Sequence, residues 1–141
     1  MLEAILILNA VWFIMGFNVF ALRGQIFAKL VVPREQRDTP VIDVLIHSGK
    51  FLGGFNLAFA VLNVLLLLNL ELFDKNQQWA LLLLVNAIAH GTQFAFNVPT
   101  ALANRRGEGV WQVLSGTMLF IFVVDFLMMA LNAFLAGRYF F

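Results

Sequence analysis

Long apolar segments alternate with short polar segments along the 141-residue chain. Four of the apolar segments reach the length of about 20 residues that a helix needs to cross a bilayer. Short connections favour neighbouring helices that run in opposite directions. The pattern therefore predicts an all-α protein with a single transmembrane domain over residues 1–141, an integral membrane four-helix bundle with up-down-up-down topology. The expected helices cover residues 2–22, 41–70, 79–98 and 110–136.

The predicted helix ends follow from the positions of proline, glycine and charged residues. Arg23-Gly24 ends the first helix, Pro99 ends the third and Gly137-Arg138 ends the fourth. Residues 23–40 form a basic loop. Its segment 25–32 is amphipathic, which is typical of a short helix lying at the membrane surface.

The composition agrees with a membrane location and removes several functions. The chain is 62% hydrophobic and 12% charged, and soluble domains have about twice this charged share. Cysteine is absent, which excludes disulfides, thiolate nucleophiles and cysteine metal sites. A net charge of +1 gives no indication of a nucleic-acid partner. Glu3 stands where a cleaved signal peptide would carry positive charge, so we expect the first apolar segment to remain as a helix.

Lysine and arginine are distributed unevenly between the polar segments. Segments 23–40 and 100–109 hold most of them, whereas the opposite side has only Lys75 and Arg138. Short loops that are rich in these residues stay in the cytoplasm. We therefore expect a protein of the bacterial inner (plasma) membrane, with the lipid bilayer around it and with both the N and the C terminus outside the cytoplasm.

One polar stripe follows an otherwise apolar helix. Asn86, His90, Gln93 and Asn97 lie at positions i, i+4, i+7 and i+11, and this spacing puts them on one side of a helix. Polar groups cannot face lipid tails without a large cost in free energy, so the stripe must face other helices or a cavity. It is the first candidate for a ligand-binding surface.

Polar residues of the other helices are expected around this stripe. Asp43, His47 and Lys50 share one face of the second helix, although Asp43 and Lys50 are near enough to its end to reach the membrane surface. Asp125 interrupts an apolar run of the fourth helix. An acid there costs about 2.5–3.5 kcal/mol on insertion scales and marks a functional site, unless it is a protonated or Asn-paired structural acid. Asn18 adds a polar group from the first helix.

We estimate the depth of each side chain in the membrane at about 1.5 Å per residue along its helix. These depths place the polar side chains together in a pocket that opens to the cytoplasmic half of the bundle. The expected pocket comprises His47, Lys50, His90, Gln93, Asn97 and Asn18, with Asn86 and Asp125 in a deeper layer that Asn63 or Asn132 would join.

We expect this pocket to bind or move a small lipophilic or polar ligand, without catalysis of its own. A second hypothesis is an electron-transfer protein in which His47 and His90 hold a b-type haem as axial ligands. A third is a small lipid-modifying enzyme in which Asp43 orients His47 as a general base. A fourth is a non-catalytic accessory subunit of a larger membrane complex, in which the polar groups join helices.

The second helix also carries a motif for close helix packing. Gly49-x-x-x-Gly53 is a small-xxx-small pattern, which lets a neighbouring helix approach. Four helices are few for a self-contained transporter, so we expect a homodimer, with this glycine face as one possible contact surface.

Overall fold

The computed structural model describes residues 1–141 and consists of helices and connecting loops without strands. A π-helical turn continues the first helix, and short 3-10 turns lie in two of the connections. The helices are α1 (Leu2–Phe17), α2 (Gly24–Val31), α3 (Val41–Leu68), α4 (Asn76–Arg105) and α5 (Gly116–Phe140), the π-helical turn is Asn18–Leu22, and the 3-10 turns are Arg34–Gln36 and Leu70–Leu72.

Four of these helices are long and apolar enough to cross a membrane: α1 with its π-helical turn, α3, α4 and α5. This agrees with the number of apolar helices that the sequence predicts. The predicted amphipathic segment 25–32 corresponds to α2, which packs against α3.

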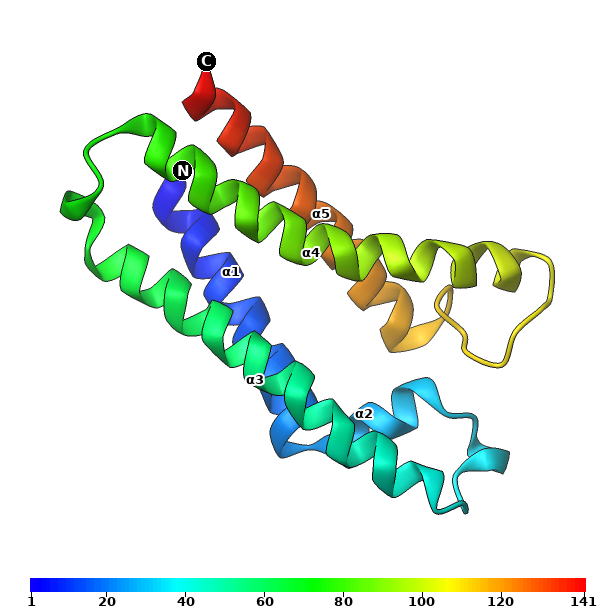
Figure 1. The fold of residues 1–141 in the computed structure, drawn as a ribbon. Helices are drawn as coiled ribbons and strands as arrows, with labels where there is room; N and C mark the ends of the chain where they lie inside the picture. The colour runs from blue at the N-terminus through cyan, green and yellow to red at the C-terminus, as the bar shows by residue number, and fades with distance from the viewer.

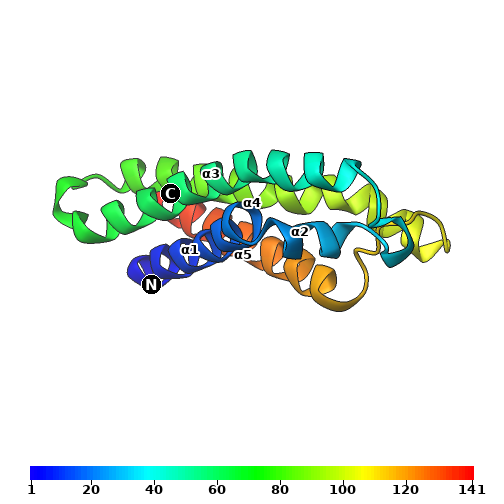
Figure 2. The same cartoon turned by 90° about the horizontal axis from the view of Figure 1, so that it is seen from below.

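The helices associate as two pairs. α1 packs against α3, and α4 packs against α5 (Figure 1). The pairs come together at the end that holds both chain termini and the connection between α3 and α4, and they diverge toward α2 and the loop before α5. Seen after the quarter turn, the molecule is elongated, with α3 and α4 along one side and α1 and α5 along the other (Figure 2).

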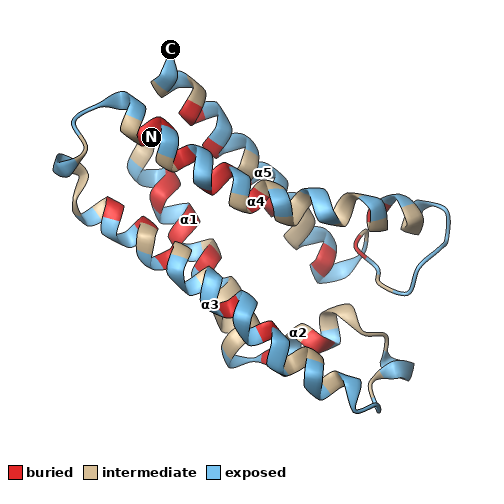
Figure 3. Ribbon diagram, viewed as in Figure 1, coloured by how far each residue is buried: buried red, intermediate tan, exposed pale blue.

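Burial is concentrated where the two pairs converge. The buried residues of α1, and most of those of α3, α4 and α5, lie on facing sides of the helices in this half of the molecule (Figure 3). Many large apolar side chains on the outer faces stay exposed, among them Phe51, Phe55 and Phe96. The convergent half is therefore the place where polar side chains can be shielded by protein.

The sequence pattern predicted that the third long helix ends at Pro99. In the structure this helix, α4, continues to Arg105. Proline removes only one N–H donor, and helices surrounded by apolar groups tolerate this loss when nearby polar groups compensate. Because α4 extends further, depths counted from residue 98 place its polar stripe too near the helix end. His90 lies about 22 Å from the end at Arg105, at about 1.5 Å per residue.

The fourth long helix begins at Gly116 instead of residue 110. Asn104 holds the preceding segment as a loop, because its Oδ1 accepts from the backbone N–H of Val113 at 2.7 Å and its Nδ2 donates to the Trp111 carbonyl at 2.9 Å. Gly116 has φ +55°, a left-handed conformation that glycine adopts readily. A right-handed helix cannot run through this residue, so α5 starts there.

Gly49 and Gly53 do allow a close approach, but the neighbour is the chain itself. Both glycines are buried. A Cβ on Gly53 would lie 2.8 Å from the backbone nitrogen of Ala21, and one on Gly49 would lie 2.9 Å from the Phe27 ring. The glycine face is therefore covered within one chain and is not available as the predicted homodimer surface.

Candidate functional site

A network of asparagine side chains joins the four long helices at the convergent end. Asn9 of α1 and Asn132 of α5 form a reciprocal pair, since the Nδ2 of each donates to the Oδ1 of the other at 2.9 Å. Asn9 Nδ2 also donates to Asn63 Oδ1 on α3 at 3.2 Å, and Asn63 Nδ2 donates to Asn86 Oδ1 on α4 at 2.8 Å. All four side chains are fully buried. Each helix thus contributes one amide to a shared core.

Three of these amides are also anchored to their own helices. Asn63, Asn86 and Asn132 each donate through Nδ2 to the backbone carbonyl four residues earlier, at 2.8–3.0 Å. A side chain bound in this way has little freedom to rotate. The positions of the three amides are therefore set by helix geometry, and Asn9 is set by the amides around it.

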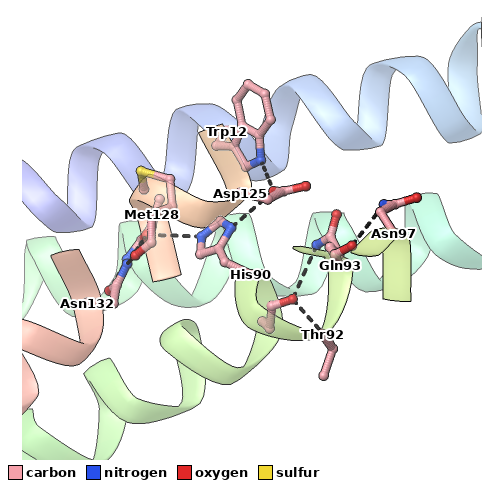
Figure 4. A network of polar contacts seen from close by, with 10 residues as sticks. Trp12, His90, Thr92, Gln93, Asn97, Asp125, Met128 and Asn132 are labelled. Atoms are coloured by element: carbon pink, nitrogen blue, oxygen red, sulfur yellow. Dashed lines mark hydrogen bonds and ion pairs between the residues drawn. The ribbon is translucent and has the colours of Figure 1, made fainter. Parts of the chain in front are cut away.

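His90 lies at the edge of this network. Its Nε2 is 3.2 Å from Asn9 Oδ1, and its ring stacks on Phe13 with centroids 4.6 Å apart. Figure 4 shows the ring between Asp125 and Asn132. Phe13 stacks in turn on Phe59 of α3. The imidazole is fully buried, so its orientation is fixed by one polar contact and one aromatic face.

Asp125 of α5 completes the cluster. Its Oδ1 accepts from Trp12 Nε1 at 2.8 Å and lies 3.6 Å from His90 Nδ1. The carboxylate is 1% exposed, yet its Oδ2 has no hydrogen-bond partner, and neither does His90 Nδ1. The site therefore combines a network of paired amides with two buried polar atoms that have no hydrogen-bond partner.

The free atoms are on the side of the cluster where the helix pairs begin to diverge. In Figure 4 the unpaired oxygen of Asp125 points toward the part of α4 that carries Gln93 and Asn97. Both side chains are half-buried, and both bond to their own helix, Asn97 Nδ2 to the Gln93 carbonyl at 2.8 Å and Gln93 Nε2 to the Ala89 carbonyl at 3.5 Å. They lie next to the site without closing it.

Several predicted site residues lie elsewhere. His47 and Lys50 are exposed on α3, and no hydrogen bond or ion pair joins either to the cluster. His47 is about 24 Å along α3 from Asn63, at about 1.5 Å per residue, whereas Asn63 is two contacts from His90. Asn18 is half-buried in the π-helical turn, where its backbone carbonyl accepts from the N–H of Arg23 at 2.8 Å.

This separation corrects the expectation that His47 and His90 share one layer, and it removes the geometric basis for haem within one chain. Axial ligands must reach opposite faces of one flat macrocycle. The expected general-base pair also changes, because Asp43 is exposed like His47, and no hydrogen bond links the two. The acid and the histidine that do approach each other are Asp125 and His90.

Asn9 is the central residue that the sequence interpretation missed. It is the only amide or charged residue between Glu3 and Asn18 in an otherwise apolar helix, and the same argument that singled out Asp125 applies to it. Trp12 lies in the middle of the same apolar helix, and its indole N–H donates to the carboxyl group of Asp125.

The chemistry available here is that of one carboxylate, one imidazole and several amides. No group of three or more histidine, aspartate or glutamate side chains is placed to hold a metal ion. Proton binding and the binding of a hydrogen-bonding or cationic group remain within reach of these residues. The chain matches no family model, no curated protein and no solved structure in the comparisons made.

Proposed function

We propose that this chain is an integral membrane protein that binds or moves a small ligand at the His90–Asp125 pair, between its two helix pairs. The four long apolar helices support membrane insertion. So do Phe51, Phe55 and Phe96, which are 70–81% exposed, since apolar surface of this extent is unusual in water and ordinary in lipid. The distribution of lysine and arginine favours an orientation with both termini outside the cytoplasm.

The observation that carries the proposal is the unpaired Oδ2 of Asp125 inside the protein. Leaving a buried polar atom without a partner costs about 1–3 kcal/mol, and more when the atom is charged. Acidic residues among membrane helices typically belong to substrate or ion pathways. A ligand that supplies a donor to this oxygen would recover the lost free energy.

The surroundings define the chemical class of the ligand. A carboxylate oxygen accepts hydrogen bonds and attracts cations, and the helices beside it supply aromatic side chains, among them Phe94, Phe122 and Phe126, which pack on one another. The fitting ligand carries an N–H, an O–H or a positive charge on a small apolar body. It approaches past Gln93 and Asn97, which lie on the diverging side of the site.

The test compares the small molecules that co-purify with three proteins in mild detergent, measured by mass spectrometry. Asp125→Asn keeps the shape and the acceptor for Trp12 but removes the charge. Asp43→Asn makes the same chemical change at an exposed position of α3 and serves as the control. A hydrogen bond to a charged group contributes about 1.5–3 kcal/mol. The amount of ligand that co-purifies with Asp125→Asn should therefore be lower than in the wild type by a factor of about ten or more.

The wild-type protein and Asp43→Asn should carry the same compound in similar amounts. An identical set of compounds in all three proteins would show that Asp125 does not hold a ligand, and the proposal would fail.

A further inference from the structure

The orientation of the Asn132 amide is fixed by its own helix. Its Nδ2 donates to the Met128 carbonyl at 2.8 Å, and the reversed amide would place two oxygen atoms against each other. Its Oδ1 must then be the atom that meets Asn9 Nδ2, and its Nδ2 the atom that meets Asn9 Oδ1. The pairing therefore also fixes which end of the Asn9 amide is oxygen.

A second contact leads to the same orientation of Asn9. Asn63 is fixed in the same way as Asn132, because its Nδ2 donates to the Phe59 carbonyl at 2.9 Å. Its Oδ1 can accept only from a donor, and that donor is Asn9 Nδ2. Two independent constraints, from α3 and from α5, thus turn the Asn9 oxygen toward His90.

The tautomer of His90 follows from this oxygen. Asn9 Oδ1 has no hydrogen to give, so His90 Nε2 must carry the proton of the contact at 3.2 Å. In a neutral imidazole the other nitrogen, Nδ1, then presents a lone pair. That lone pair faces Asp125 Oδ1 at 3.6 Å.

If Nδ1 carried no proton and Asp125 were ionised, two hydrogen-bond acceptors, Nδ1 and Oδ1, would face each other inside the protein. Only a proton resolves this conflict. We infer that the His90–Asp125 pair binds one proton at the core of the four helices, either on Nδ1 as imidazolium facing carboxylate or on the carboxyl group facing neutral imidazole. In both forms Nε2 keeps its own proton and the pair as a whole is uncharged.

No other titratable side chain takes part in this site. His90 and Asp125 are the only titratable residues among the fully buried ones. The side chains in contact with the pair are the amide of Asn9, the indole of Trp12 and the phenyl ring of Phe13, and none of them titrates. The proton is therefore shared only by His90 and Asp125. Asn9 acts as a positioning residue: by accepting from Nε2 it leaves Nδ1 as the imidazole nitrogen that gains or loses this proton.

This inference does not depend on the identity or existence of the ligand proposed above. It does connect with that proposal, because a cationic group at Asp125 Oδ2 would stabilise the charged carboxylate and favour release of the proton. Ligand binding and proton release would then be coupled at one pair of residues.

Nitrogen-15 NMR of histidine-labelled protein in detergent tests the proton directly. His47→Gln, at an exposed position outside the site, leaves His90 as the only imidazole. Carbon-13 labelling of aspartate reports the carboxyl of Asp125, which Asp125→Asn assigns. Two results support the inference: protons on both ring nitrogens with an ionised Asp125, or a proton on Nε2 alone with a protonated Asp125.

Two other results would overturn it. A neutral ring with its proton on Nδ1 would contradict the orientation of Asn9, and a proton on Nε2 alone beside an ionised Asp125 would show that the pair is empty. These outcomes concern the protein without added ligand, so they are distinct from the loss of a co-purified compound.

Asn9→Leu tests the positioning role in the same His47→Gln background. Without the oxygen of Asn9, no side chain accepts a hydrogen bond from Nε2. Nε2 should therefore lose its proton, and the one remaining ring proton should lie on Nδ1, where it can be donated to Asp125. Asn97→Leu removes an amide that bonds only to its own helix and should keep the original tautomer. An unchanged His90 spectrum in folded Asn9→Leu would refute this role, and the His47→Gln spectrum alone decides the proton inference if Asn9→Leu does not fold.

Discussion

Asn9→Leu should also destabilise the protein by an amount that can be worked out from its contacts. Three buried atoms have their only partner in Asn9: Asn63 Oδ1, Asn132 Oδ1 and His90 Nε2. Asn132 Nδ2 keeps the Met128 carbonyl and is not left alone. Leucine has the same branched shape as asparagine, so the change removes the polar partners, and the larger methyl groups at these 2.9–3.2 Å contacts add to the destabilisation.

Interhelical hydrogen bonds in membrane proteins contribute about 0.6 kcal/mol on average and at most about 1.7 kcal/mol. Three lost partners therefore predict a loss of about 2–5 kcal/mol in the free energy of unfolding. Asn97→Leu is the matched control, because Asn97 donates only to the Gln93 carbonyl of its own helix. We expect its effect to stay within about 0.5 kcal/mol.

The measurement is reversible unfolding in mixed micelles with increasing dodecyl sulfate, followed by circular dichroism. Asn9→Leu should unfold at a clearly lower detergent fraction than both the wild type and Asn97→Leu. If the two variants unfold together, the amide network does not hold the helix pairs in contact, and the reasoning about Asn9 is refuted.

Three further predictions concern packing, cofactor and topology. Gly53→Ala should lower the free energy of unfolding by about 1–3 kcal/mol, because the new Cβ would lie 2.8 Å from the backbone of Ala21. Gly54→Ala has nothing within 4 Å of its Cβ and should leave the stability unchanged or raise it by up to about 1 kcal/mol. Equal stability of the two variants in thermal unfolding would contradict the packing. The visible spectrum of gently purified protein should lack a Soret band, since His47 and His90 are far apart, and a band lost in both His47→Ala and His90→Ala would reverse this conclusion. A reporter fused to the C-terminus should report a non-cytoplasmic location, and a cytoplasmic signal would overturn the orientation.

Hydrophobic patterning alone was sufficient to predict the four apolar helices and to identify part of the site. Asn86 and His90 share a stripe that does face protein, and Asp125 in its apolar run is buried as expected for a costly intramembrane acid. In each case a polar residue lies in a long apolar segment. Because facing lipid would cost free energy, such a residue is expected to face the other helices. The burial of such residues can be predicted without knowing which helix packs against them.

The partners of these residues could not be predicted from the sequence. His47 and His90 were matched by counting depth from assumed helix ends, and α4 continues past Pro99 for about two further turns. An error of this size moves a residue by about 11 Å along a helix, which exceeds the reach of any side chain. Periodicity fixes the face of a helix, but the register between helices depends on contacts such as the Asn63–Asn86 hydrogen bond.

The contrast between satisfied and unsatisfied atoms is our reason for proposing a functional role for the cluster rather than a packing role. If the polar residues only joined helices, as in an accessory subunit, their atoms would be expected to pair with one another, and the four asparagines do so. Three buried side-chain atoms in the chain lack partners: Trp111 Nε1, in the loop before α5, and the two atoms of the His90–Asp125 pair.

The two unpaired atoms of the cluster belong to its only titratable groups. The helices around them satisfy the neutral amides within the same site, so poor packing does not account for the difference. We expect such a core, which pairs its amides and leaves open its one acid and one imidazole, of a site that takes up a proton or a ligand. In this proposal Asn9 connects the rigid amide network to the His90–Asp125 pair.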